Sequence, residues 1–401
     1  MKSKDMVRAG WLMDGSSGSI RRDVFLEMEN GFVTELGWNG SRGHDPYEDK
    51  SHRRVWDLSD CTLIPGLIDC HVHLSMSGTP DRGEREHQLS RTFEEVKPVI
   101  EEHLRHHASR GIVAVRDGGD AHGHTLWYKK RWMKEDCVPV RLKSPGKAWR
   151  SPGRYGRLIG DPPPEGSSLA DCVARYARSA DHVKIVNSGL NSLREFGKET
   201  LPQFNLDELR MAVRRGEELG RKTMVHANGK GPVSMALKAG CHSIEHGFFM
   251  QKDNLERLAE QQVYWVPTLF TMKAYASLLE PGSLESRVAA LNLESQLEQV
   301  SRARAMGVLL AVGTDSGSLG VHHGTSFVEE LKLLQEAGLD LHEILRAATL
   351  HGAALLGVED ECGPLRVGSP ATFVALLGPP SRLIESLSRP TVVCIRGVDV
   401  L

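Results

Sequence analysis

The sequence lacks the features that mark several large classes of protein. No stretch of the 401 residues approaches about 18 uninterrupted apolar residues, so we expect no membrane span. The first residues, "MKSKDMVRAGWLMDG", carry no apolar core behind their two lysines, and we therefore expect no secretory signal. The formal net charge is only −2, which favours neither nucleic acid nor a membrane surface as a partner.

Cysteine is also scarce, and its spacing is not that of a disulfide framework. The seven cysteines stand at positions 61, 70, 137, 172, 241, 362 and 394, an odd number without a CxxC pair. This usage fits a reducing compartment, so we expect a soluble cytoplasmic protein. Hydrophobic residues make up 40% of the chain, enough to build a large buried core.

Both ends of the chain have the pattern of short β-strands. The segment "IRRDVFLEMENGFVTELGW" places "ENG" between two β-rich runs, which is typical of a hairpin. The closing stretches "RVGSPATFVALLG" and "TVVCIRGVDVL" are again strand-like. We therefore predict one small β-sandwich domain from residues 1–65 and 359–401, with residues 66–358 inserted between its halves.

The middle of the chain alternates short apolar runs with helical segments. The helical segment "NLDELRMAVRRGEELG", for example, has one apolar face and Asn205 as a candidate N-cap. The eight runs are "GLIDCHVHL", "GIVAVRDGG", "VPVRLKS", "DHVKIVNSG", "KTMVHANG", "HSIEHGFF", "YWVPTLF" and "VLLAVGTDSG". Eight βα units predict an α/β fold of the (β/α)8 TIM-like barrel type. An open doubly wound sheet is the alternative, since the count depends on weak runs such as the third.

Polar side chains end or interrupt five of these runs. His71 and His73 share one face of the first strand, because alternate side chains point the same way and Val72 points to the other face. The further polar residues are Lys184, His226, His246 and Asp315. The carboxyl ends of barrel strands meet at one face, so these groups are expected close together. Imidazole nitrogen and carboxylate oxygen are ligands for a cation such as Zn²⁺.

Each of these residues also has an ordinary structural explanation. A lone histidine at a strand end is often hydrogen-bonded within the core, and Asp315 in "GTDSG" is suited to a turn or a helix cap. A second His-x-His pair, His122 and His124, follows two glycines and is expected in a loop. The histidines between residues 103 and 107 lie in a charged helical segment. The coincidence of several polar groups at strand ends is what favours a metal site.

Lys184 is unusual because apolar residues surround it within the "VKIV" run. Burial penalises the ammonium form and lowers the pKa of a lysine. A salt bridge or a side chain that reaches the surface would relieve that penalty. Beside two cations, the neutral amine has a second option, which is to react with CO2 and form a carbamate. That group is an anionic oxygen ligand able to bridge two metal ions.

Taken in order, the motifs resemble those of the amidohydrolase superfamily. They are "LIPGLIDCHVHL", "GIVAVRDGG", "VHANG", "GPVSMALKAGCHSIEHG", "VPTL", "GTDSG" and "LRAATLHGAALLG". Within the superfamily the chain is similar to the imidazolonepropionase-related proteins and to carboxylated-lysine prolidases of the Xaa-Pro or Xaa-Arg dipeptidase type. The resemblance implies two divalent ions of the zinc type, bridged by a carboxylated lysine and a hydroxide. The implied ligands are His71, His73 and Asp315 for one ion, His226 and His246 for the other, and Lys184 between them.

The resemblance also implies metal-dependent hydrolysis of a C–N bond. Asp315 would take the proton of the attacking water and pass it to the leaving nitrogen. A dipeptide or an N-acyl amino acid ranks first as the substrate, because the loop "SPGKAWRSPGRYGRLIG" is basic enough to bind a carboxylate. Ureas, carbamates and cyclic amides are the alternative. The expected substrate contacts are Tyr155, Arg154, Asn228 and His323.

Other functional classes fit the sequence less well. A non-catalytic barrel scaffold would have lost ligands, whereas all six ligand positions are filled. A nucleotide-binding protein is disfavoured because "HANGKGPVS" has neither the Walker spacing nor the dinucleotide fingerprint. We expect a small-molecule substrate and a homo-oligomer.

Overall fold

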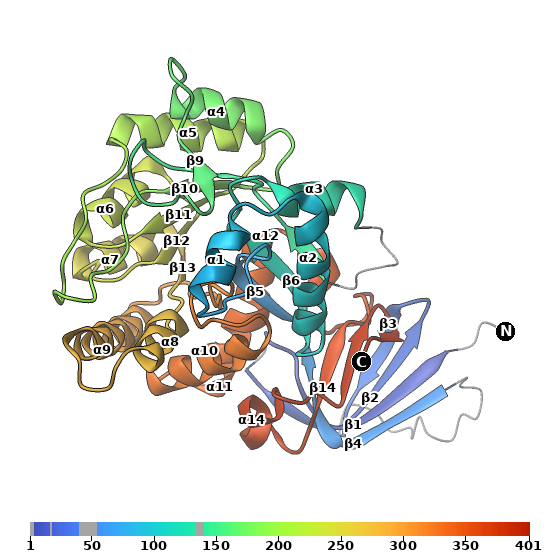
Figure 1. The fold of residues 1–401 in the computed structure, drawn as a ribbon. Coiled ribbons are helices and arrows are strands. Elements are labelled where there is room, and N and C mark those ends of the chain that lie inside the picture. Colours follow the sequence, from blue (N-terminus) through green and yellow to red (C-terminus); the bar gives the residue numbers. More distant parts are fainter. Residues whose placement is uncertain (1–3, 17, 40–53, 134–139) are drawn as a thin grey trace.

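The computed structural model describes residues 4–16, 18–39, 54–133 and 140–401, which form a β-sheet beside a ring of strands and helices (Figure 1). The sheet has seven strands in the order β16-β15-β14-β4-β1-β2-β3. Its members are β1 (Asp5–Met13), β2 (Ile20–Glu29), β3 (Phe32–Gly37), β4 (Arg54–Pro65), β14 (Phe373–Leu377), β15 (Val392–Ile395) and β16 (Val398–Asp399).

Both ends of the chain contribute to this sheet. Strand β4 pairs in parallel with β1 on one side and antiparallel with β14 on the other, where Leu63 faces Ala375. The predicted hairpin joins β2 to β3, and Asn30 and Gly31 supply its two left-handed positions, with φ of 52° and 80°. These residue types tolerate positive φ, which explains why "ENG" could be recognised as a turn. One apolar core, with Leu26 and Phe373 among its members, holds the sheet together.

The barrel strands carry the predicted site. They are β5 (Leu67–Val72), β6 (Ile112–Asp117), β7 (Arg141–Lys143), β10 (Val183–Val186), β11 (Thr223–Ala227), β12 (Ser243–His246) and β13 (Tyr264–Val266). Two short strands, β8 (Ala148–Trp149) and β9 (Gly160–Asp161), extend the sheet beside β10. The third predicted run begins at Val138, outside the described residues, and only its last part forms β7.

The eighth run closes the ring through backbone hydrogen bonds rather than a regular ladder. Trp265 N of β13 donates to Leu309 O at 2.8 Å, and Cys70 N of β5 donates to Val312 O at 2.8 Å. On the opposite side of the barrel, Asp181 N donates to Ser144 O at 3.0 Å, between β10 and the end of β7. The eighth segment thus lies between β13 and β5, as a barrel requires.

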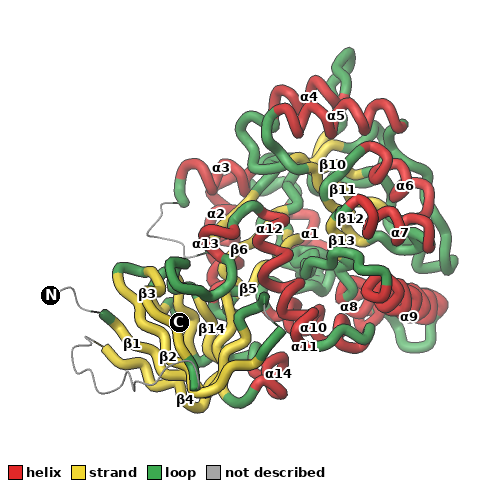
Figure 2. Tube along the Cα trace, turned by 180° about the vertical axis from the view of Figure 1, so that it is seen from behind, coloured by secondary structure: helices red, strands yellow, loops and turns green. Residues whose placement is uncertain are grey.

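Helices cover the outside of the strands (Figure 2). They are α1 (Arg82–Gln88), α2 (Phe93–Ala108), α3 (His124–Arg131), α4 (Leu169–Tyr176), α5 (Leu206–Glu218), α6 (Lys230–Ala239), α7 (Lys252–Gln261), α8 (Phe270–Leu278), α9 (Leu284–Ala305), α10 (Thr325–Glu336), α11 (Leu341–Arg346), α12 (Gly352–Leu356), α13 (Glu359–Cys362) and α14 (Leu383–Ser386). Helix α5 begins where predicted, because the Asn205 side chain accepts a hydrogen bond from Glu208 N at 2.9 Å.

The predicted α/β barrel is confirmed, and the β-sandwich predicted from both chain ends is found as one seven-stranded sheet to which both ends contribute. The exact division at residues 65/66 and 358/359 stays a prediction. Among the described residues, no helix has both the length and the apolar character needed to cross a membrane.

Candidate metal centre

The structure brings the six predicted ligands together inside the barrel. All six side chains are buried. His71 and His73 lie at the end of β5, Lys184 lies within β10, His226 lies near the end of β11, His246 ends β12, and Asp315 belongs to the eighth segment. The strand-end reasoning therefore placed these residues at one face of the barrel correctly, while their roles as ligands stay predictions.

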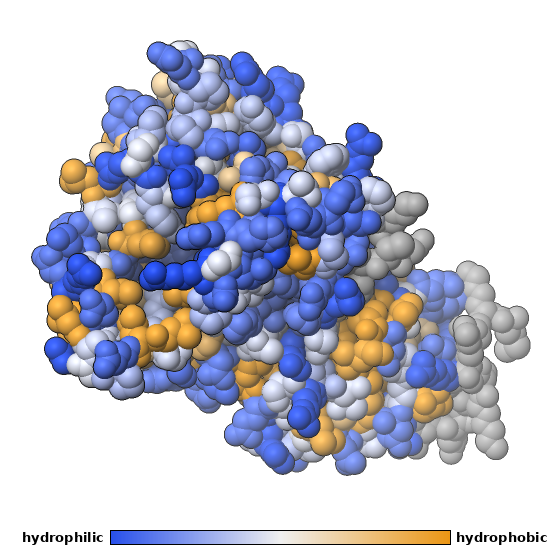
Figure 3. All heavy atoms as spheres, in the orientation of Figure 1, coloured by the Kyte–Doolittle hydropathy of each residue, from blue (hydrophilic) through white to orange (hydrophobic). Residues whose placement is uncertain are grey.

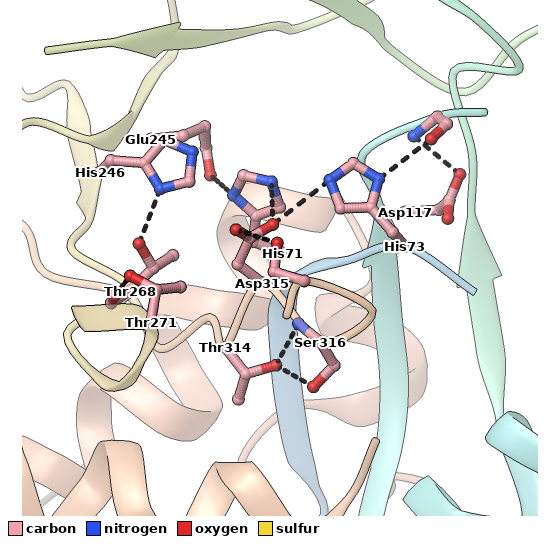
Figure 4. Close-up of polar contacts among 12 residues, drawn as sticks. His71, His73, Asp117, Glu245, His246, Thr268, Thr271, Thr314, Asp315 and Ser316 are labelled. Atoms are coloured by element: carbon pink, nitrogen blue, oxygen red, sulfur yellow. Dashed lines mark hydrogen bonds and ion pairs between the residues drawn. The ribbon is translucent and has the colours of Figure 1, made fainter. Parts of the chain in front are cut away.

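Four imidazole rings follow one another across the site, in the order His73, His71, His246 and His226. Neighbouring ring centroids are 5.4, 5.0 and 4.6 Å apart. Asp315 Oδ1 lies 3.4 Å from Nε2 of His71 and 3.3 Å from Nε2 of His73 (Figure 4). Within the described residues, these three side chains are the only trio of His, Cys, Asp or Glu whose ligand atoms all lie within 4.8 Å of one another.

Each of the four rings has one nitrogen engaged by a neighbour outside the row. Two rings face side chains: Nδ1 of His71 lies 2.9 Å from Glu245 Oε2, and Nδ1 of His246 lies 2.7 Å from Thr268 Oγ1. The other two face backbone carbonyls: Nδ1 of His73 lies 3.0 Å from Gly119 O, and Nε2 of His226 lies 3.1 Å from Gly189 O. The carboxylate and carbonyl partners of His71, His73 and His226 require an N–H on that nitrogen, so the opposite nitrogen of a neutral ring keeps its lone pair. The Thr268 hydroxyl beside His246 can either donate or accept. Histidines that bind metals are held in this way.

The backbone at the strand ends adopts left-handed conformations that these residue types rarely take. His246 has a φ of 67°, Thr268 of 47° and Asp315 of 58°. Such a residue costs on the order of 1–3 kcal/mol and persists only where surrounding contacts enforce it. Two predicted ligands and the partner of one of them share this feature, which marks the strand ends as a functional region.

A buried ion pair lies behind His71. Arg116 Nη2 is 2.8 Å from Glu245 Oε1, and Arg116 Nε donates to Cys70 O at 2.7 Å. Burial alone would raise the pKa of Glu245, but the charge of Arg116 and the contact with His71 hold that pKa well below its usual range. Glu245 is therefore an anion that fixes the orientation of the His71 ring.

Asp69 ties the first strand to the eighth segment. Its Oδ1 accepts from Thr314 N at 3.0 Å and its Oδ2 accepts from the Thr314 hydroxyl at 2.7 Å. These bonds set the position of the neighbouring Asp315. Burial raises the pKa of Asp69 to about 7, against the effect of these hydrogen bonds.

Glu245, Arg116 and Asp69, which hold the predicted ligands in place, were not among the site residues predicted from the sequence. Each stands within a quoted motif, "SIEHG", "VAVRDGG" or "LIDCH". A charged residue inside an apolar strand was the signal that identified Lys184, and the same signal would have found these three.

Lys184 has neither of the two features that usually stabilise a buried lysine, which are access to solvent and a salt bridge. It is 1% exposed, so its ammonium does not reach solvent. Within the described chain, no carboxylate oxygen lies at ion-pair distance, and Nζ is 3.5 Å from Nε2 of His71. Burial lowers the pKa of Lys184 to about 8, although Glu245 and Asp315 oppose that effect. Burial therefore makes the neutral amine more accessible in Lys184 than in an exposed lysine.

The carboxylate of Asp315 divides its two oxygens between different partners. Oδ1 faces the rings of His71 and His73, and Oδ2 accepts a hydrogen bond from Ser318 Oγ at 2.7 Å. Burial alone would raise its pKa, but the imidazoles of His71 and His73 hold the pKa of Asp315 below its usual range. Asp315 is thus an ionised group able to accept a proton.

Two of the expected substrate contacts lie beside the row of rings. The Tyr155 ring is 5.3 Å from the ring of His226. The Asn228 amide contacts backbone groups, since Oδ1 accepts from Phe248 N at 3.1 Å and Nδ2 is 3.4 Å from Gly189 O. Asn228 therefore shares the carbonyl of Gly189 with His226, which suits a residue that supports the ring.

The other two expected contacts already have partners outside the row. Arg154 is exposed, and its guanidinium donates to Leu201 O at 2.7 Å. His323 bonds through Nδ1 with His107 Nε2 at 3.1 Å and through Nε2 with Met76 O at 2.8 Å. A contact between either residue and a substrate stays a prediction that would require a rearrangement.

Comparisons with known proteins agree with this geometry. The sequence model described as Amidohydrolase family matches residues 62–398. An imidazolonepropionase of Pseudomonas aeruginosa is 26% identical over 388 residues, covering 90% of this chain and 89% of that protein. An ochratoxinase of Aspergillus niger is 26% identical over 219 residues, or 54% of this chain, and the match spans only 45% of that enzyme. A Xaa-Pro dipeptidase crystallised with methionine in its active site superposes with a TM-score of 0.82 at 25% identity, over 99% of this chain and 100% of the other.

Proposed function

The chain belongs to the amidohydrolase family, and we propose that it is a binuclear metal-dependent hydrolase that cleaves the C–N bond of a dipeptide or an N-acyl amino acid. The main observation that supports this proposal is the row of four buried imidazoles. Each has one nitrogen engaged by an outer partner, and the row faces the ionised Asp315.

The side chains of the row fit two divalent cations, zinc being the metal we expect. His71, His73 and Asp315 form a complete set for the first ion. His226 and His246 offer two nitrogens to a second ion but no anion, and Lys184 is the residue that supplies one. In that reaction the neutral Nζ attacks CO2, an N–C bond forms, and one proton leaves. The resulting carbamate replaces a poorly solvated ammonium with an anion between two cations.

The chain's own groups divide the work of hydrolysis. Bound cations would polarise a carbonyl and lower the pKa of a water molecule. Asp315 accepts the proton of the attacking water and delivers it to the leaving nitrogen, so that the amine departs uncharged. Ser318 fixes Oδ2 of Asp315, while Glu245 and Gly119 O keep the rings of His71 and His73 in place.

One comparison supports a substrate related to amino acids. The structural relative named a Xaa-Pro dipeptidase holds methionine, a free amino acid, in its active site. The ochratoxinase and imidazolonepropionase relatives carry names of other substrates, so ureas, carbamates and cyclic amides remain the alternative class. A small-molecule substrate and a homo-oligomer stay predictions.

Metal analysis combined with a substrate screen tests the proposal. Protein grown with zinc and bicarbonate should contain about two ions per chain and hydrolyse N-acyl amino acids or dipeptides. Lys184→Met should contain about one ion and lose most turnover, whereas Lys147→Met, which removes a lysine paired with Asp161 at 2.8 Å, should match the wild type. Metal-free protein with full activity, or a Lys184→Met variant that keeps two ions, would overturn the binuclear centre. Activity on phenylureas or carbamates alone would select the alternative class.

A further inference from the structure

We propose that Arg85 binds the free carboxylate of the substrate and that the carboxyl-terminal residue of that substrate is apolar. The proposal rests on the proposed function, whose substrate it narrows. Arg85 lies on α1, in the segment that follows β5 and its two histidines. The sequence had instead predicted that the basic loop around Arg154 contacts the substrate carboxylate.

The guanidinium of Arg85 lies at the rim of the metal centre. Its Nη1 donates to Gly317 O at 3.3 Å and to Thr79 O at 3.4 Å. Gly317 stands two residues after Asp315, and Thr79 belongs to the loop that follows His73. Arg85 therefore bridges the two loops that leave the first metal site.

Arg85 lacks the partner that such a charge normally has. Within the described residues, no carboxylate lies at ion-pair distance from its guanidinium, and its two hydrogen bonds there go to backbone carbonyls and are long. The neighbouring Glu84 is taken by Arg91. In the basic loop, by contrast, Lys147 pairs with Asp161 and Arg154 bonds to Leu201 O. Arg85 is thus, among the described residues, a cation near the site that is available for an anionic ligand.

The charges of Arg85 and Asp315 both act on two phenols, those of Tyr275 and Tyr155. Burial raises the pKa of Tyr275 to about 12 and raises the pKa of Tyr155 further. For each tyrosine, the charge of Asp315 also raises the pKa and the charge of Arg85 lowers it. Tyr275 also hydrogen-bonds the Ser318 side chain, which donates to Asp315. Arg85 therefore belongs to the surroundings of the proton-transferring carboxylate.

A cavity of about 440 Å³ adjoins Arg85, which is within the size range of small-molecule sites. The surface is visibly hollowed beside α1 (Figure 3). Its apolar lining includes Met76, Leu158 and Leu319, and its polar lining includes Gln88, Arg82 and Glu86. Arginine binds carboxylate through two parallel hydrogen bonds, and the apolar wall suits an aliphatic or aromatic side chain next to that carboxylate.

A pair of substrates that differ only in the carboxylate tests this assignment. We expect Arg85→Met to lower kcat/KM for N-acetyl-L-phenylalanine by roughly 30- to 100-fold, through KM, because a charge-assisted pair is lost. Release of acetate from N-acetyl-L-phenylalaninamide, which has no carboxylate, should change by less than about twofold. Arg85→Lys should recover part of the loss. Arg105→Met, an exposed arginine on α2 that does not line this cavity, is the control and should behave as the wild type.

Parallel losses on the acid and the amide would show that Arg85 only supports the two loops, and an unchanged KM for the acid would remove it from the site. Either result overturns the inference while the hydrolase stands. If the wild type hydrolyses no amide, the proposed function fails, and Arg85 is then judged by calorimetric binding of N-acetyl-L-phenylalanine. Binding that is at least about 30-fold weaker in Arg85→Met supports the carboxylate site, and equal or absent binding refutes it.

Discussion

Two groups of buried histidines lie close together in this protein and differ in the use of their nitrogens. The central row consists of His73, His71, His246 and His226, and the outer cluster consists of His103, His107 and His323. In the outer cluster, both ring nitrogens of His323 form hydrogen bonds, one with His107 and one with Met76 O. Nδ1 of His103 hydrogen-bonds with Leu74 O. The rings of His103 and His323 stack 3.8 Å apart. In the central row, one nitrogen of each ring is held by an outer partner and the row borders Asp315.

Burial does not distinguish the two groups, and the pKa sets apart only His73, whose pKa burial lowers but the hydrogen bond and charge of Asp315 raise above the usual value. Burial is the leading cause that lowers the pKa of His71 to about 4 and of His246 to about 3 in the central row. Burial likewise lowers the pKa of His103 to about 4 and of His107 to about 3 in the outer cluster. Only the central row, among the described residues, joins a carboxylate to two rings within 4.8 Å. A nearby anion shared by two rings therefore marks the metal site, and the number of histidines does not.

The largest expected effect comes from removing the anion of the central row. Asp315→Asn keeps an oxygen that can contact a cation but cannot accept a proton. We expect kcat to fall by at least about 1,000-fold while metal content stays near the wild-type value. Steady-state kinetics and plasma emission spectrometry measure the two quantities. Retained turnover would refute the proton-transfer role, and loss of metal would assign Asp315 a mainly ligating role.

A smaller effect, on metal affinity, is expected when Glu245, the outer partner of His71, loses its charge. Glu245→Gln keeps the shape of the side chain but removes the charge that holds His71, so metal affinity should fall by roughly 10- to 100-fold. Competition with a chelator measures this change. The control is Glu330→Gln, another fully buried carboxyl group, whose pKa burial raises to about 8. Equal losses in both variants would contradict a specific role for Glu245.

Disrupting the outer cluster should leave the metal centre intact. His323→Leu removes the partners of His107 and of Met76 O, which should cost about 2 kcal/mol of the free energy of unfolding. Urea denaturation measures the loss, and metal content should remain at the wild-type level. His73→Leu is the comparison, in which metal should be lost. A metal-depleted His323→Leu variant would break the distinction between the two groups.

A further expected effect, spread over several pH units, is on the pH dependence of stability. The pKa of His107 in the folded protein, about 3, lies below the free value of about 6.5, so the unfolded chain takes up this proton first as pH falls. The corresponding stability is complete above pH about 6.5 and is lost toward pH 4. His107→Leu should therefore reduce the slope of stability against pH by about 1.4 kcal/mol per unit in that window. Urea denaturation of metal-free protein at several pH values measures the slope, and an unchanged slope would contradict a neutral, buried His107.

The sequence predicted the residues of the centre better than their supporting contacts. Strand-end position is a local property, so His71, His226 and Asp315 could be placed from apolar runs alone. The partners of His73 and His226 are carbonyls of Gly119 and Gly189, which carry no side-chain signal. Glu245 acts across strands, and that relation appears only when the barrel is closed.

Long side chains limit what the sequence can say about the carboxylate contact, and the contact predicted for the basic loop stays a prediction. A sequence places an arginine in a loop, but the guanidinium extends several bonds beyond the backbone. Arg154 bonds outward to Leu201 O, whereas Arg85, in a helix that our sequence analysis did not single out, lies near Asp315. Only coordinates separate these two outcomes.

The pairing of β4 with β14 has a consequence for how the chain matures on the ribosome. Leu63 emerges during translation about three hundred residues before Ala375, its partner in the sheet. At about 5–20 residues per second, β4 waits roughly 15 to 60 s with one edge uncovered. The intervening βα units have that interval to close around their own core. The nascent polypeptide therefore needs protection of that edge, from a chaperone or from the growing barrel, until its last strands are synthesised.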